Sequence, residues 1–114
     1  MTAALQTPLT IAIDIDGTWS LDPRLFRRIA VQFKEAGWNV IIVTGSQQPA
    51  EKLARLWLDP FIIIVSGPLL KEEAARKAGY KVDVWIDDMP GMIQNCRILR
   101  GDLDPAPETL ESRN

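Results

Sequence analysis

Short apolar runs alternate with amphipathic stretches along this chain. Four runs are rich in β-branched and other apolar side chains, which is typical of strands buried on both faces of a sheet. The predicted strands cover residues 9–14, 38–43, 61–65 and 82–86. The stretches that follow the first three runs space their apolar residues three or four apart, as amphipathic helices do. The pattern therefore predicts strands and helices in alternation.

The first predicted helix has a clear beginning and end. Asp22 is a suitable N-cap because Pro23 follows it at the first helical position, and Gly37 ends the helix. Its buried side is predicted to carry Leu25, Phe26, Ile29, Ala30 and Phe33.

Two further helices are predicted in the same way. The second covers residues 50–58, and Asp59 and Pro60 stop it. Its expected buried side chains are Leu53, Ala54 and Trp57. The third covers residues 70–78 and ends at Gly79.

This alternation predicts the fold class. Strands joined by helices of this length form βαβ units, whose right-handed crossovers give a mainly parallel sheet covered on both faces. A helical turn after Pro90 and a fifth strand over residues 96–99 complete the expectation of a three-layer α/β/α, Rossmann-like fold with about five strands. Residues 1–100 are predicted to form a single domain, and the acidic residues 101–114, with few apolar side chains, are predicted to be disordered.

Composition and net charge exclude several classes of function. The net charge of −2 leaves no strong nucleic-acid footprint, and no apolar run is long enough to span a membrane. The chain has no histidine, which excludes Ser-His-Asp and Cys-His catalysis and the usual zinc sites. The single cysteine, Cys96, allows no internal disulfide, and residues 1–10 do not read as a signal peptide. A cytoplasmic protein is expected.

Polar side chains follow each predicted strand. Asp14 and Asp16 come after the first, Thr44 after the second, residues 66–71 after the third and Asp87-Asp88 after the fourth. Because the carboxyl ends of parallel strands share one edge of a sheet, these groups should converge in one crevice.

The chemistry of this predicted crevice favours phosphoryl transfer. Carboxylates that crowd together need a cation, and Mg²⁺ prefers oxygen ligands of this kind. A hydroxyl, a lysine and backbone N–H groups are suited to holding phosphate. A Mg²⁺ cofactor and a phosphorylated substrate, either a small molecule or the end of a macromolecule, are therefore expected.

At these residues the sequence resembles the haloacid-dehalogenase superfamily of hydrolases. The segment from Asp14 to Thr18, Asp-Ile-Asp-Gly-Thr, is similar to the first motif of the family, and Val-Thr-Gly-Ser around Thr44 to the second. Lys71 is the preferred candidate for the third motif, with Lys77 as its rival, and Asp87-Asp88 fits the acidic fourth.

The resemblance implies a role for each residue. Asp14 would be the nucleophile that forms an aspartyl-phosphate, and Asp16 the general acid and base, which needs a pKa raised above its free value. Thr44, Gly45 and Lys71 would hold the phosphoryl group. Mg²⁺ would be held by Asp14, the backbone carbonyl of Asp16, and Asp88, with Asp87 assisting; the relative roles of Asp87 and Asp88 stay open.

The resemblance also bears on cap domains, which cover the site in many members of the family. The chain has no room for a cap after Gly17 or between Ser46 and Lys71, so the minimal, capless type is expected. A homo-oligomer could then cover the site. The loop carrying Trp19 is the only nearby element for excluding water, although Trp19 is expected to pack the loop rather than contact a substrate.

Two other classes of protein fit the sequence less well than a Mg²⁺-dependent phosphatase. A phosphoacceptor receiver domain needs an aspartate after the third strand, where this chain has Ser66 and Gly67. A dinucleotide-binding fold needs a glycine-rich turn after the first strand, where only Gly17 is present. The alternative that stays open is a non-catalytic interaction or regulatory module with the same fold.

Overall fold

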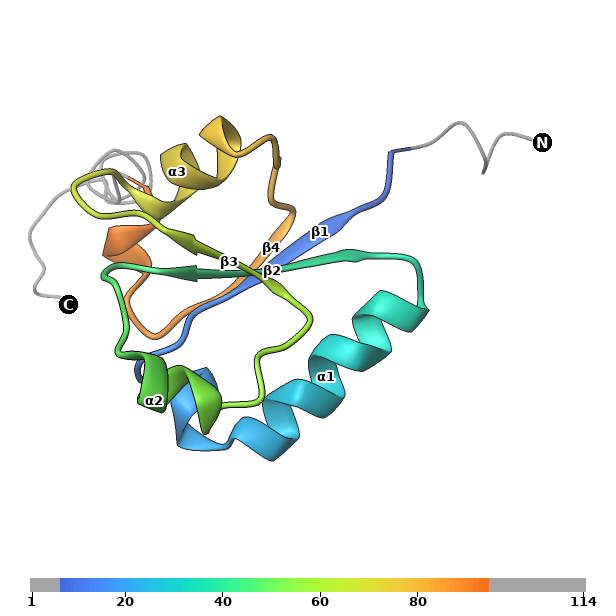
Figure 1. Cartoon of the computed structure of the whole chain (residues 1–114). Helices are drawn as coiled ribbons and strands as arrows, with labels where there is room; N and C mark the ends of the chain where they lie inside the picture. Colours follow the sequence, from blue (N-terminus) through green and yellow to red (C-terminus); the bar gives the residue numbers. More distant parts are fainter. Residues whose placement is uncertain (1–6, 95–114) are drawn as a thin grey trace, which may run out of the picture.

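The computed structural model of the chain describes residues 7–94, and Figure 1 shows its arrangement. The elements are β1 (Thr10–Ile13), α1 (Pro23–Glu35), β2 (Asn39–Thr44), α2 (Ala50–Ala54), β3 (Ile62–Val65), α3 (Lys71–Lys77) and β4 (Val84–Ile86). Short 3-10 helices cover Trp19–Leu21 and Pro90–Met92. The second of these is the helical turn expected after Pro90.

The four strands form one sheet in the order β3-β2-β1-β4, and every neighbouring pair is parallel. Ile13 lies opposite Ile42 on one side and Ile86 on the other, so β1 occupies the centre. Along the chain, β2 is added on one side of β1 and β3 next to β2, and β4 then pairs with the other side of β1. This α/β architecture is compatible with a Rossmann-like fold.

Helices cover both faces of the sheet (Figure 1). On one face, buried Ile11, Ile13 and Ile42 pack with Ala30 of α1 and with Leu56, Leu58 and Phe61. On the other face, Ala12, Ile41 and Val43 pack against Ala75 of α3. Alternate side chains of each central strand thus enter opposite cores, which explains why β1 and β2 are apolar at nearly every position.

The first helix forms as its sequence predicts. The carboxylate of Asp22 accepts a hydrogen bond of 3.2 Å from the backbone N–H of Leu25, and Pro23 stands in the first turn. Phe26, Ile29 and Phe33 are half-buried and Ala30 is buried, whereas Leu25 remains 39% exposed. The expected buried side is therefore correct except at its first position.

The second helix is shorter than predicted, and two of its three expected core residues, Ala54 and Trp57, are wrong because both are exposed. α2 stops at Ala54, and Trp57 adopts a left-handed backbone conformation with φ of 55°. This turn directs Leu56 and Leu58 into the core and leaves Trp57 45% exposed. Arg27 of α1 donates hydrogen bonds to the backbone carbonyls of Trp57 and Asp59, which ties the segment after α2 to α1.

The third strand was expected to be buried, and it is not. Ile62, Ile63 and Val65 are 51%, 37% and 39% exposed. Among the strands of residues 7–94, β3 lies at the edge of the sheet, and the five residues of α2 are too few to cover it. An unbroken apolar run thus predicts a strand correctly without showing whether it lies at the centre or the edge of the sheet.

Trp19 packs inside the protein. Its ring is fully buried, lies 6.4 Å from Phe26 and 6.2 Å from Phe61 between centroids, and donates a 2.7 Å hydrogen bond from Nε1 to the carbonyl of Leu56. The packing role was expected. The loop therefore does not offer Trp19 as a cover for the site.

Some sequence predictions fall outside the described residues. These are the fifth strand over residues 96–99, Cys96 and the tail over residues 101–114. Among the helices between residues 7 and 94, none has the length and hydropathy that crossing a bilayer requires.

Candidate active site

The polar groups that follow the strands lie around one small cavity. Because β1 is the strand from which the chain departs in both directions, its carboxyl end borders the crevice where open α/β sheets place ligands. The cavity has a volume of about 140 Å³. Its lining includes all the residues predicted for the site, namely Asp14, Asp16, Thr44, Gly45, Lys71, Asp87 and Asp88.

Lys71 joins two carboxylates at the floor of this cavity. Its Nζ lies 2.8 Å from Oδ1 of Asp14 and 2.7 Å from Oδ2 of Asp87. All three side chains are buried, with exposures of 5%, 5% and 1% for Lys71, Asp14 and Asp87. The rival Lys77 is exposed at the end of α3. The structure therefore places Lys71, and not Lys77, beside Asp14.

The pKa values of Asp14 and Lys71 are both raised, for different reasons. Burial raises the pKa of Asp14 above its ordinary value, and the charge of Asp87 adds to this effect, while Lys71 opposes it. Burial disfavours the charge on Lys71, but its hydrogen bonds to Asp14 and Asp87 raise the Lys71 pKa. One ammonium pairs with two buried carboxylates. Lys71 therefore stays charged, and the negative charge of Asp14 is only partly neutralised.

Three carboxylates could hold a metal ion here. Asp14, Asp87 and Asp88 each offer an oxygen within 4.8 Å of the other two. Such a group fits an oxygen-binding divalent cation, which would relieve the repulsion that Lys71 leaves. Asp16 contributes no carboxylate to this cluster.

The turn after Asp16 lies against the metal-binding group. Gly17 has φ of +77°, and a Cβ placed there would lie 2.3 Å from Oδ2 of Asp88. The turn thus requires glycine for its backbone conformation and for the close approach of Asp88.

Thr44 presents a buried hydroxyl to the same cavity. Its Oγ1 accepts a 3.2 Å hydrogen bond from Nε2 of Gln48, and lies 3.5 Å from the carbonyl of Ser46, to which it donates. The Gln48 amide also reaches Oδ2 of Asp16 at 3.1 Å. Gln48 therefore links Thr44, the last residue of β2, to Asp16, which follows β1.

Asp16 is held differently from what the sequence predicted. Its carboxylate forms an ion pair with Lys52 and is 57% exposed. The hydrogen bond from Lys52 lowers the pKa of Asp16, against a smaller opposing effect of burial, and Gln48 lowers it further. The sequence-based expectation of a raised pKa is wrong in this state, because the neighbours of Asp16 are a cation and an amide rather than a carboxylate or an apolar wall.

Four residues at or near the cavity were missed by the sequence analysis. Gln48 and Lys52 contact Asp16, and Met89 and Met92 line the cavity. Gln48 lies before α2 and Lys52 lies within it. No spacing in the sequence indicates that they meet, because the path of the chain from Gly45 to Pro49 decides that both face Asp16.

Ser66 also follows a strand, but its contribution differs. Its Oγ is buried without a hydrogen-bond partner among the described residues, and it does not line the cavity. The sequence grouped residues 66–71 as one polar signal, and of these Lys71 supplies the side chain that reaches the site.

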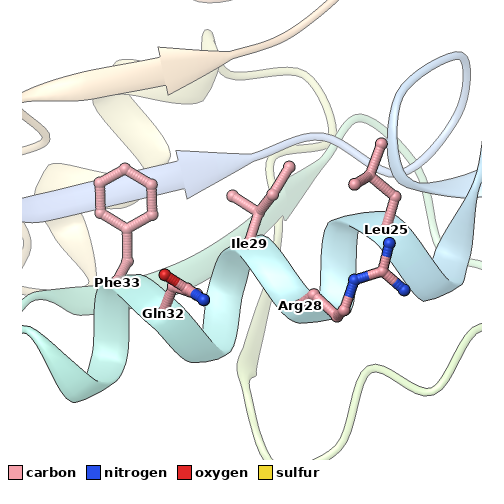
Figure 2. Close-up of a pocket in the computed structure, with 5 residues that line it drawn as sticks. All are labelled: Leu25, Arg28, Ile29, Gln32 and Phe33. Atoms are coloured by element: carbon pink, nitrogen blue, oxygen red, sulfur yellow. The ribbon is translucent and has the colours of Figure 1, made fainter.

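A second hollow, of about 360 Å³, lies on α1. Figure 2 shows Leu25, Ile29 and Phe33 projecting from the same side of this helix, with Arg28 and Gln32 beside them. The hollow brings together no set of carboxylates, hydroxyls and cations comparable to that of the first cavity.

Comparisons with known proteins add no relative. No protein-family model, no curated protein and no solved structure matches the chain. The functional interpretation therefore depends on the geometry of this site.

Proposed function

We propose that the protein is a Mg²⁺-dependent phosphomonoester hydrolase that acts through an aspartyl-phosphate. The observation that carries the proposal is the arrangement around Asp14. A buried lysine and two further aspartates surround this carboxylate in a cavity of about 140 Å³, beside the hydroxyl of Thr44. These are the groups that the resemblance to haloacid-dehalogenase hydrolases requires.

The first step would transfer the phosphoryl group to Asp14. A carboxylate oxygen of Asp14 attacks phosphorus while the bond to the leaving oxygen breaks, and Asp16 gives that oxygen a proton. Lys71 and the hydroxyl of Thr44 hold phosphoryl oxygens and offset their charge. The second step returns the enzyme to its starting state, because water attacks phosphorus, gives its proton to Asp16 and releases orthophosphate from Asp14.

A bound Mg²⁺ would supply positive charge that lets an anionic nucleophile approach an anionic phosphate. Asp14, Asp87 and Asp88 would hold it, together with the backbone carbonyl of Asp16. The mutual proximity of the three carboxylates supports this ligand set. Because Asp87 also accepts from Lys71 and from the N–H of Met89, it is the most constrained of the three.

The test is Mg²⁺-dependent release of orthophosphate from a broad panel of phosphomonoesters. Asp14→Asn should lower kcat by at least about 1,000-fold because it removes the nucleophile. Asp59→Asn, which changes an exposed aspartate outside the cavity, is the matched control and should be fully active. Acid-quenched wild-type protein should carry a phosphate that hydroxylamine removes. Activity that survives Asp14→Asn would contradict the assignment.

One observation favours the alternative of a non-catalytic interaction or regulatory module. Asp16 faces Lys52 and has a lowered pKa, which is unsuited to a general acid until Asp16 leaves this ion pair. A protein that binds Mg²⁺ but hydrolyses no member of the panel would establish that alternative.

A further inference from the structure

A cation that the proposed reaction does not use contacts Asp16, one of the residues that line the cavity. Lys52 pairs with Asp16, and the two side chains are 34% and 57% exposed. Exposed ion pairs contribute little free energy, so Asp16 can exchange this partner at small cost. Lys71 and its partners are at most 5% exposed, and that contact is a fixed part of the site.

The size of the cavity limits what enters it. Pockets that enclose a whole drug-sized ligand measure roughly 300–1,000 Å³. The cavity here, at about 140 Å³, accommodates a phosphoryl group and leaves the rest of the substrate at the mouth. Recognition of the leaving group therefore depends on residues around the cavity. Met89 and Met92 line it, and Lys52 contacts Asp16, which also lines it.

The proposed reaction disturbs the ion pair between Lys52 and Asp16. To reach the ester oxygen, the carboxyl group of Asp16 must turn from Lys52 toward the substrate. The ammonium then faces the leaving group without its former partner. A negative group on that part of the substrate would replace the lost contact, whereas a neutral leaving group would not.

We propose that Lys52 selects phosphomonoesters whose leaving group carries a second anion, a carboxylate or a phosphate, which takes the place of Asp16 beside the Lys52 ammonium. This inference rests on the proposed function for the movement of Asp16. The predicted specificity can be measured by binding as well as by turnover, so the two proposals can fail separately.

The binding experiment uses phosphonates, which are not hydrolysed. Calorimetry in Mg²⁺ compares phosphonoacetate and methylenebisphosphonate with methylphosphonate, so that a carboxylate and a second phosphonate are tested separately. The wild-type protein should bind at least one of the two probes with a second anionic group about 10-fold more tightly than methylphosphonate, as expected for a partly exposed charge-assisted hydrogen bond. Lys52→Met should abolish this ratio, and Lys52→Arg should retain part of it.

The turnover experiment compares 3-phosphoglycerate with glycerol 3-phosphate, and a nucleoside 3′,5′-bisphosphate with the 5′-monophosphate. The kcat/KM ratio in favour of the anionic member should fall in Lys52→Met, mainly through KM. Arg55→Met, which removes an exposed cation just after α2, should leave the ratio unchanged.

Each outcome bears on one proposal or both. Hydrolysis with equal preference for anionic and neutral leaving groups, or a preference that survives Lys52→Met, would overturn the role of Lys52 alone. A binding preference that depends on Lys52, without hydrolysis of any ester, would support the anion site and overturn the phosphatase. Absence of both binding and hydrolysis would overturn both.

Discussion

At the scale of single residues, Gly17 affects both the backbone conformation of its turn and the geometry of the proposed metal site. Gly17→Ala combines a strained φ with a Cβ that would overlap Asp88, so Asp88 must move. We expect Mg²⁺ affinity, measured by calorimetry, to fall roughly 10- to 100-fold, the usual effect of disturbing groups that position metal ligands.

Gly37→Ala is the matched control for this substitution. Gly37 also has positive φ, at +96°, but a Cβ there meets nothing within 4 Å. Both variants should lose about 1 kcal/mol or more of stability because of the backbone strain. Only Gly17→Ala should weaken Mg²⁺ binding, and equal affinities in the two variants would refute the proposed contact with Asp88.

The carboxyl group of Asp16 offers a second prediction at this scale. Lys52 and Gln48 lower its pKa, so in metal-free protein a ¹³C NMR titration should find its midpoint below the ordinary value of 3.8. A lowered folded-state pKa means that the ion pair contributes stability above the unfolded-state pKa and loses it as pH falls through the folded-state value. Lys52→Met should move the midpoint upward. A midpoint at or above 3.8 in the unsubstituted protein would contradict the geometry.

At this scale the position of one site residue could be predicted from the sequence, whereas the pKa of another could not. Lys71 could be preferred over Lys77 because a lysine in the first turn of a helix lies nearer the strand edge than one two turns later. The pKa of Asp16 could not be predicted, because it depends on Gln48 and Lys52. These reach Asp16 from a segment 32 and 36 residues away in sequence.

At the scale of elements, α1 is the helix whose sequence most fully specifies its boundaries. Asp22→Ala removes the acceptor for the N–H of Leu25 and should lower the free energy of unfolding by about 1 kcal/mol. Thermal unfolding should report this as a Tm lower by roughly 4–8 °C. Asp22→Asn, which retains a capping oxygen, should remain close to the unsubstituted protein. A wild-type Tm for Asp22→Ala would show that the cap contributes no stability.

In α2 and β3, the local sequence pattern does not determine where the helix ends or how far the strand is buried. The order of strands and helices follows from the alternation of apolar runs and amphipathic stretches, and the structure agrees. The early end of α2 depends on the left-handed turn at Trp57 and on Arg27, which satisfies carbonyls from a different helix. The exposure of β3 depends on its place in the strand order, which no residue within the strand encodes.

At the scale of the whole molecule, metal binding should be coupled to folding. The cluster of Asp14, Asp87 and Asp88 exists only when β1 and β4 are paired, so Mg²⁺ should stabilise the folded chain and not the unfolded one. At a Mg²⁺ concentration about 100 times its Kd, the gain should be about 2.7 kcal/mol, visible as a higher Tm.

Asp88→Asn separates this effect from general screening by salt. The variant should lose most of the Mg²⁺ response, and without metal its Tm should be higher than that of the unsubstituted protein because one negative charge leaves the cluster. A Tm increase with Mg²⁺ no larger than that produced by NaCl of equal ionic strength would argue against a specific site.

The residues of the proposed chemistry lie at one end of the sheet only, and this has a practical consequence. Every side chain assigned a chemical role lies at or beyond the carboxyl end of a strand, while the chain turns at Gly37 and Gly79 at the opposite end. Those turns are exposed and carry none of the proposed chemistry. A fluorophore or an affinity peptide introduced there would report on the protein, or tether it to a surface, with the mouth of the cavity still open to solution.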